Sequence, residues 1–524
     1  MVWEMSESGD WVLPRVNGEQ IPSKPPLYHW TAATFAGLLG GVSERAVRLP
    51  SILSASLAIG LVFAAAAVEW GVVVAVIAAV TLATSPEWVK WATTARTDAT
   101  FAFFLTAAFL LGHRWLRSGK PAALFLLAAA TGAATLAKGF AGAALVGLVV
   151  AIESWRGAAW RGWRAGSLLL AAVIFCAVAG SWYAAALMRG GGAFFEKQIV
   201  LENVLRFFPY EGGGPSRRHS VLFYVPTLFT GMLPWSIALP HALLRGARER
   251  RPGADGGGFS GYLLSWFSVV FVVCTAASGK RSNYLLPLYP AAALLIGRQL
   301  AAVLEQAGSS SAERALRASG LAAAALCAAV GAVLVSWRLG FEPWTPVLRW
   351  LHPQDRVLLP QMTAAIGRPG IPLILLAAGF SVALLAATEL RAWRDLYGLI
   401  GGFMLLVTVA GCLWVSQLES ALKSFQPFTE RVSARVGSDP VTFLGAADYA
   451  VLFYLKRHVP VGREGIQAIA RPGWALVWKK DWDALSAAER EASEIAEESP
   501  PASVGRPDTR LLLVSLPARR GASP

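Results

Sequence analysis

Long apolar segments with few or no charges constrain this chain more than any other feature, and 166–188 and 396–415 are clear examples. A bilayer core needs about 20 apolar residues per spanning helix. Helices of soluble proteins rarely run that far without a polar face. Only 15% of the residues are charged, whereas soluble proteins carry about a quarter. The sequence therefore predicts an all-α polytopic membrane protein.

By this length criterion we expect about twelve spanning helices. They are expected near 50–68, 72–88, 97–113, 121–137, 140–154, 167–188, 219–240, 259–278, 284–303, 317–337, 370–389 and 396–416. Arginine-rich turns follow alternate spans, such as the turns that hold Arg117, Arg161 and Arg250. Positively charged loops favour the cytoplasmic side, so the other loops, the segment 1–46 and the tail after 416 are predicted to be external.

The first residues show neither the basic nor the apolar region of a cleavable signal peptide. An external segment 1–46 with no helix before it is awkward to translocate. Either a preceding helix is missing, which would make thirteen spans, or the short tail crosses unaided.

Composition excludes some other classes of function. The net charge is +14, but no basic and aromatic segment stands outside the apolar blocks, which argues against nucleic acid as a partner. The four cysteines lie within apolar segments without metal-type spacing, so they are predicted to be packing residues.

Many cations fall in loops that the topology assigns to the external side, against the usual tendency. They are Lys24, Arg45, Arg48, Lys90, Arg96, Lys138, Lys197, Arg206, Arg217, Arg218, Lys280 and Arg281. Lysine binds phosphate through its point charge, and arginine binds it through the fork of N–H donors on its planar guanidinium. The pattern predicts an anionic ligand at the outer membrane surface, with phosphate the natural candidate.

One carboxylate and one of these cations stand at span ends. Asp98 begins the third span, and a carboxylate at a membrane boundary points to function, although a structural pair with Arg96 is the alternative. Lys138 sits at a hairpin tip in Leu-Ala-Lys-Gly-Phe. Its ammonium either reaches the interface as a snorkelling side chain or contacts a phosphate.

The most complete phosphate motif opens the ninth predicted span. Lys280 and Arg281 precede Tyr284 and Tyr289 in Lys-Arg-Ser-Asn-Tyr-Leu-Leu-Pro-Leu-Tyr-Pro. An aromatic belt explains the tyrosines alone, but it does not explain two adjacent external cations.

The long external loop 189–218 mixes aromatic and charged residues and is expected to be interfacial and partly helical. Glu202 and Arg206 have the spacing of a helical ion pair. His219 with a carboxylate suggests a divalent metal, although one histidine is weak evidence for it. Nearer the N-terminus, Asp10 is expected to fix a loop, and Lys24 is rigidly presented before two prolines.

The tail 417–524 is predicted to be a small α/β domain, separate from a membrane domain over 1–416. Strands are expected at 441–445, 475–478 and 510–516, and helices at 448–457 and 482–497.

These motifs together resemble the aminoarabinose-transferase branch (glycosyltransferase family 83 type) of the protein-mannosyltransferase-like superfamily, which has the GT-C fold. The resemblance is carried, in the family's order, by Ser-Gly-Asp-Trp (8–11), Lys-Pro-Pro-Leu (24–27), Arg-Leu-Pro-Ser (48–51), Arg-Thr-Asp (96–98), Leu-Ala-Lys-Gly (136–139), Glu-Asn-Val-Leu-Arg-Phe (202–207), Leu-Pro-Trp (233–235) and Lys-Arg-Ser-Asn-Tyr-Leu-Leu-Pro (280–287).

The resemblance implies inverting transfer of a sugar from an undecaprenyl-phosphate carrier to a lipid, glycan or protein acceptor at the periplasmic face of a bacterial inner membrane. It implies no obligatory cofactor. Asp98 would be an essential acid. The carrier phosphate would be held by Lys24, Lys138, Arg206, Lys280, Arg281 and Tyr284, while Glu202, Asn203 and Tyr289 would contact substrate.

Two departures keep alternatives open. The family's first-loop Asp-Glu pair has no counterpart here, and Ser23 stands where many members have Glu before Lys-Pro, which weakens a metal shared with His219. A flippase for a lipid-linked anion and a degenerate carrier-binding relative are the rival hypotheses. A flippase would be expected to place its charges near the bilayer midplane.

Overall fold

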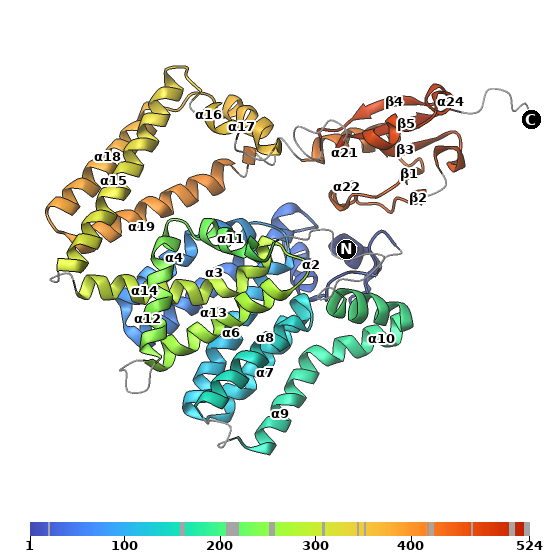
Figure 1. Ribbon diagram of the computed structural model, residues 1–524. Helices are drawn as coiled ribbons and strands as arrows, with labels where there is room; N and C mark the ends of the chain where they lie inside the picture. The colour runs from blue at the N-terminus through green and yellow to red at the C-terminus, as the bar shows by residue number, and fades with distance from the viewer. Residues whose placement is uncertain are drawn as a thin grey trace, which may run out of the picture. The chain divides into compact units, whose positions relative to one another are not determined.

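The computed structural model describes residues 1–18, 21–157, 163–205, 220–250, 257–306, 310–342, 345–349, 353–415, 417–418, 424–462, 465–501 and 509–517. The chain forms two compact units (Figure 1). The first comprises 1–16, 20–319 and 387–408, and the second comprises 17–19, 320–386 and 409–524. The second unit thus takes in residues that precede the predicted domain boundary at 416, and that boundary stays a prediction.

Within the described ranges, nine helical stretches are long and apolar enough to cross a membrane. They are α3 (Glu44–Trp70), α6 (Thr97–Ser118), α7 (Pro121–Lys138), the run α9–η2–α10–η3 (Ala165–Phe175, Cys176–Gly180, Ser181–Phe194, Phe195–Val204), α13 (Gly257–Ala276), η6 with α14 (Ser282–Leu288, Tyr289–Glu305), α15 (Ser310–Arg338), α18 (Ile371–Glu389) and α19 with η7 (Trp393–Ala410, Gly411–Val415). The predicted multi-pass helical membrane fold is confirmed.

Three of the twelve expected spans differ from straight spanning helices. The span expected at 72–88 is α4 (Val72–Ala83) and α5 (Pro86–Ala92), bent by 66°. Pro86 keeps Ser85 extended and so breaks the helix there. The span expected at 219–240 is η4 with α11 (Val221–Phe223, Tyr224–Gly231) followed by η5 with α12 (Trp235–Ala238, Leu239–Glu249), bent by 117°. The third, at 140–154, is α8 (Ala141–Arg156), which has only 16 residues.

Small residues let the helices of the first unit approach closely, as is usual in membrane bundles. A Cβ added at Gly297 of α14 would lie 2.8 Å from the Cβ of Ala78 in α4, and one added at Gly132 of α7 would lie 2.9 Å from the Cβ of Val178. Helices α3, α4, α6, α7, α8, α13 and α14 pack into one core (Figure 1). Two short helices, α1 (Val2–Ser8) and α2 (Leu27–Leu38), precede it.

The tightest of these contacts predicts a clear loss of stability. A Cβ at Gly231 would lie 2.2 Å from the hydroxyl oxygen of the fully buried Tyr289 and 2.9 Å from the Cβ of Glu87. We expect Gly231→Ala to cost about 1–3 kcal/mol through overpacking. Gly60→Ala in α3 is the matched control, because nothing lies within 4 Å of its added Cβ. Thermal unfolding of the purified proteins tests this, and equal midpoints for both variants would contradict the packing of α5, α11 and α14.

In the second unit, α16 (Thr345–Leu348) and α17 (Pro353–Ile366) lie between α15 and α18 in sequence. A mixed five-stranded sheet follows, in the order β2-β1-β3-β5-β4. Its strands are β1 (Val441–Leu444), β2 (Val461–Gly462), β3 (Gly473–Trp478), β4 (Glu494–Glu498) and β5 (Leu511–Leu516), and its helices are α21 (Gln426–Val436), α22 (Tyr449–Leu455), η8 (Ile466–Ala468), α23 (Lys479–Asp483) and α24 (Ala487–Glu491). The small α/β character of the tail is confirmed, and β1, α22, β3 and β5 lie where they were expected.

The helix predicted over 482–497 is wrong. The segment instead forms the end of α23, the short α24 and the edge strand β4. Ser486 and Glu489 form a capping box that starts α24. Antiparallel pairing of β4 with the buried strand β5 then outweighs the helix propensity of the Ala- and Glu-rich sequence.

Candidate functional site

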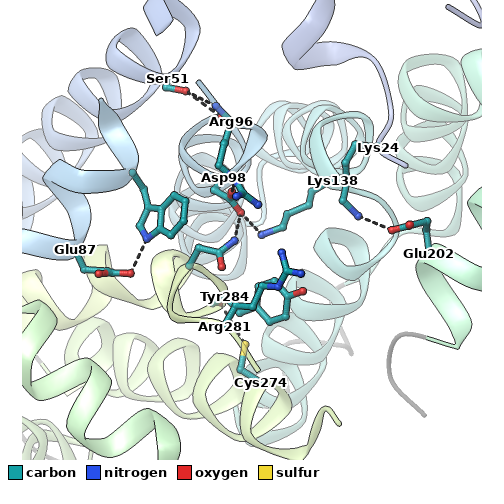
Figure 2. Close-up of polar contacts among 12 residues, drawn as sticks. Lys24, Ser51, Glu87, Arg96, Asp98, Lys138, Glu202, Cys274, Arg281 and Tyr284 are labelled. Atoms are coloured by element: carbon teal, nitrogen blue, oxygen red, sulfur yellow. Dashed lines mark hydrogen bonds and ion pairs between the residues drawn. The ribbon is translucent and has the colours of Figure 1, made fainter. Parts of the chain in front are cut away.

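Asp98 is the centre of a polar cluster at the N-terminal end of α6. Its side chain is 2% exposed. Its Oδ1 accepts hydrogen bonds from Lys138 Nζ at 2.5 Å and Asn283 Nδ2 at 2.7 Å, and its Oδ2 accepts one from Arg96 Nε at 3.2 Å (Figure 2). A carboxylate offers about four acceptor positions, so three of them are already used. The cluster satisfies a buried charge, as burial requires.

The Arg-Leu-Pro-Ser motif fixes the backbone of Arg96. Ser51 Oγ donates to the Arg96 carbonyl oxygen at 3.0 Å. The guanidinium lies over the Trp91 ring, 5.1 Å from its centroid, a cation–π geometry. Trp91 in turn donates its Nε1–H to Glu87 at 2.6 Å. Arg96 is therefore oriented from its backbone and from its side chain, and the alternative of an Arg96–Asp98 pair is confirmed as part of a larger cluster.

Lys138 is the last residue of α7. Besides the bond to Asp98, its ammonium lies 5.2 Å from the ring centroid of Phe101 and 5.0 Å from that of Tyr284. The side chain is 14% exposed. The ammonium therefore points to the buried carboxylate of Asp98.

Lys24 is held by a carboxylate from the long loop. Its Nζ lies 3.0 Å from Glu202 Oε2 (Figure 2), and Lys197 Nζ lies 3.7 Å from Glu202 Oε1. Residues 189–204 of that loop belong to α10 and η3, with a kink at Gly191, whose φ is 55°. Arg206 and His219 lie outside the described residues, so neither the expected Glu202–Arg206 pair nor a metal at His219 is described.

Asn203 makes its side-chain hydrogen bonds to backbone. Its Oδ1 accepts from Phe140 N at 3.0 Å, and its Nδ2 donates to the Gln198 carbonyl oxygen at 2.5 Å. These bonds fix the hairpin after Lys138, and contact of Asn203 with a substrate stays a prediction.

The residues of the Lys-Arg-Ser-Asn-Tyr motif lie in different surroundings. Lys280 is 6% exposed and donates to the Ala277 carbonyl oxygen at 2.9 Å, so it binds a carbonyl just beyond the end of α13, as basic side chains do at helix C-termini. The carbonyl oxygen of Arg281 accepts a hydrogen bond from Tyr284 N at 3.1 Å, which places Arg281 in the turn whose Tyr284 ring lies 5.0 Å from Lys138 Nζ (Figure 2). Its guanidinium makes no ion pair with any residue in the described ranges.

Tyr289 was expected to contact substrate, but it does not lie in the cluster around Asp98. It is 0% exposed and packs in the core of the first unit, where its hydroxyl faces Gly231. Tyr289 is the first residue of α14, and the residues that follow it, up to Gly297, are buried as well.

Asp10 fixes a loop, as predicted. Its Oδ1 accepts from the backbone N–H groups of Val12 and Leu13 at 3.0 Å each and pairs with Arg189 at 2.9 Å. The carbonyl of Val12 accepts from Trp182 Nε1 at 2.7 Å. The Ser-Gly-Asp-Trp motif is thereby tied to α10.

Sequence reasoning missed Asn283, Ser51, Trp91 and Glu87. Asn283 and Ser51 fall inside quoted motifs, so the motifs carried a signal that was not assigned to them. Trp91 and Glu87 have the i, i+4 spacing of neighbours on a helix, but nothing in the sequence links their helix to Arg96. For metals, no three His, Cys, Asp or Glu side chains gather as a site among the residues that the structure describes.

The cluster can neutralise negative charge at one end of the helix bundle. Lys138 and Arg96 share one carboxylate, and Arg281, in the turn that carries Tyr284, makes no ion pair with the residues that the structure describes. Cations placed at the edge of a membrane domain suit a phosphate headgroup whose lipid tail stays in the bilayer.

A bundle of apolar helices with this cluster at one end and a small α/β unit following it has the architecture of the GT-C membrane glycosyltransferases. The structure can be superposed on the crystal structure of ArnT from Cupriavidus metallidurans bound to undecaprenyl phosphate with a TM-score of 0.73, covering 100% of this chain and 93% of that one. The sequence identity is 20%, so this likeness concerns the fold.

Sequence comparisons agree with this assignment. Residues 23–183 match the family described as dolichyl-phosphate-mannose-protein mannosyltransferase. The undecaprenyl phosphate-alpha-4-amino-4-deoxy-L-arabinose arabinosyl transferase of Edwardsiella ictaluri is 30% identical over 329 residues, covering 61% of this chain and 56% of the relative. The protein of that name from Erwinia tasmaniensis is 29% identical over 364 residues, covering 68% and 62%.

These matches agree with the resemblance predicted from the motifs: the chain is similar in sequence to aminoarabinose transferases and has the GT-C fold. The chain spans less than two thirds of the length of these two curated relatives.

Proposed function

We propose that this protein transfers a sugar from an undecaprenyl-phosphate-linked donor to an acceptor hydroxyl at the periplasmic face of a bacterial inner membrane. The observation that carries the proposal is the pair of cations Arg96 and Lys138 on the buried Asp98, with Arg281 in the adjoining turn that carries Tyr284, in a fold similar to that of a protein solved with undecaprenyl phosphate. The names of the curated relatives favour an aminoarabinose donor and leave the acceptor open among lipid, glycan and protein.

The proposed reaction is a direct displacement that inverts the anomeric carbon. The acceptor oxygen forms a bond to that carbon while the bond from carbon to the phosphate oxygen breaks. The acceptor proton ends on the departing phosphate or in solvent. The carrier phosphate gains a negative charge as it leaves, and Lys138, Arg281 and Lys24 are assigned to stabilise that charge.

Asp98 has a different role in this proposal from that of a proton acceptor. Three donors already occupy its oxygens, so we assign it to hold Lys138 and Arg96 in place. Lys24 would exchange its partner Glu202 for phosphate.

The periplasmic placement is part of the proposal and is supported by the arginine-rich turns at the other ends of the helices. An impermeant thiol reagent on intact cells tests it, in a background without the four native cysteines. We expect Lys197→Cys to react and Arg164→Cys to react only after lysis. The reverse pattern would overturn the orientation.

Transfer itself is tested with purified protein in lipid nanodiscs and undecaprenyl-phosphate carriers bearing radiolabelled aminoarabinose or hexoses. Each carrier is offered with lipid A, glycan and peptide acceptors. Label on an acceptor supports the proposal. Movement of carrier between leaflets of a proteoliposome without transfer would establish a flippase, and binding of every carrier without either activity would establish a carrier-binding protein.

A further inference from the structure

A chain of three hydrogen bonds joins the two segments that carry Lys24 and Lys138. Buried Gln198 donates its side-chain Nε2–H to the carbonyl of Pro22, two residues before Lys24. The backbone carbonyl of Gln198 accepts from Asn203 Nδ2 at 2.5 Å, and Asn203 Oδ1 accepts from Phe140 N at 3.0 Å, two residues after Lys138. Both amide side chains belong to η3.

The bond to Phe140 has a local cause. Phe140 is the N-cap of α8, and the first N–H groups of a helix lack partners within it. Asn203 supplies an acceptor from a distant segment. The approach needs glycine at position 139, because its φ is +107° and an added Cβ would lie 2.4 Å from Asn203 Oδ1.

The π-helical form of η3 supplies the right spacing. In a π-helix the residue five positions earlier lies one turn below, as the bond from Leu205 N to the Val200 carbonyl shows. The same five-residue spacing places the Asn203 amide over the Gln198 carbonyl. Such segments are rare and are frequently found at functional sites.

We infer that Gln198 and Asn203 are positioning residues that fix Lys24 and Lys138 relative to each other. This inference rests on the proposed function, in which both lysines face the carrier phosphate. The phosphate gains its second negative charge only as its bond to the sugar breaks. Displacement of a cation therefore reduces stabilisation of the transition state more than it reduces binding of the donor.

The kinetic test compares Asn203→Ala and Gln198→Ala with the wild type. We expect each to lower kcat by about 10- to 100-fold, as displacement by about 1 Å does, with KM changed by less than about 3-fold. Asn203→Asp keeps an acceptor for Phe140 and loses the donor to Gln198, so its kcat should lie between the values for wild type and Asn203→Ala. Gln306→Ala, at an exposed position after α14, is the control and should leave both constants unchanged.

A second measurement does not depend on transfer. Hydrogen exchange followed by mass spectrometry should show faster exchange in a peptide covering 139–145 for Asn203→Ala than for wild type. If wild type fails to transfer any sugar, the proposed function fails, and the exchange rates still judge the hydrogen-bond chain. Wild-type kcat in Asn203→Ala, a raised KM alone, or unchanged exchange would each overturn the inference. If Asn203→Ala does not fold, Asn203→Asp carries the test.

Discussion

Asp98→Asn is expected to abolish transfer and to destabilise the protein. The amide keeps the size of the side chain but removes the charge that Lys138 and Arg96 share. Removing one partner of a buried ion pair costs about 3–5 kcal/mol, and the lower figure is expected because Arg96 is 44% exposed. Transfer per folded molecule should fall by at least about 100-fold, since the cations lose their fixed positions. Thermal unfolding and the nanodisc transfer assay measure the two effects.

The double variant Asp98→Asn/Lys138→Met separates these effects. Removing the buried ammonium along with the carboxylate should restore part of the lost stability, whereas transfer should stay absent because a phosphate-facing cation is gone. Glu389→Gln is the matched control, because its exposed pair with Arg317 (59% and 58% exposed) is expected to contribute little. Full transfer in Asp98→Asn would refute the role assigned to the cluster.

The membrane bundle was predictable because hydrophobic length is a local property. The bends at Ser85–Pro86 and near Pro234 were not, since a proline inside an apolar run is compatible with a kinked span as well as a broken one. In the tail, β1 and β3 carried buried apolar runs. β4 did not, because Glu494–Glu498 becomes a strand only through its pairing with β5.

In the candidate site, some residues were predictable from the sequence and others were not. Asp98, Lys138 and Arg281 stood out as charges at the ends of apolar spans, where the cost of burial marks them. The partners that orient them come from distant segments. Asn283 lies 185 residues from Asp98 and Asn203 lies 63 residues from Phe140. Sequence spacing alone carries no information about such contacts, and the same holds for the burial of Tyr289.

Arg281→Met is expected to reduce the affinity for undecaprenyl phosphate without loss of stability. A hydrogen bond to a charged group contributes about 1.5–3 kcal/mol, so the dissociation constant should rise about 10- to 100-fold. The guanidinium makes no ion pair with the described residues. The backbone bond from Arg281 N to the Tyr224 hydroxyl, at 3.2 Å, survives the substitution. Binding of labelled undecaprenyl phosphate and thermal unfolding give the two readouts.

Two further variants decide what Arg281 contributes. Arg281→Lys keeps the charge but loses the planar fork that binds two phosphate oxygens at once, so its affinity should fall between wild type and Arg281→Met. Arg317→Met removes an exposed arginine of α15 and should leave affinity unchanged. A lowered unfolding temperature with unchanged affinity in Arg281→Met would show that the guanidinium supports the fold. The carrier phosphate would then have to be held by Lys24 and Lys138, which are paired with Glu202 and Asp98 in the structure.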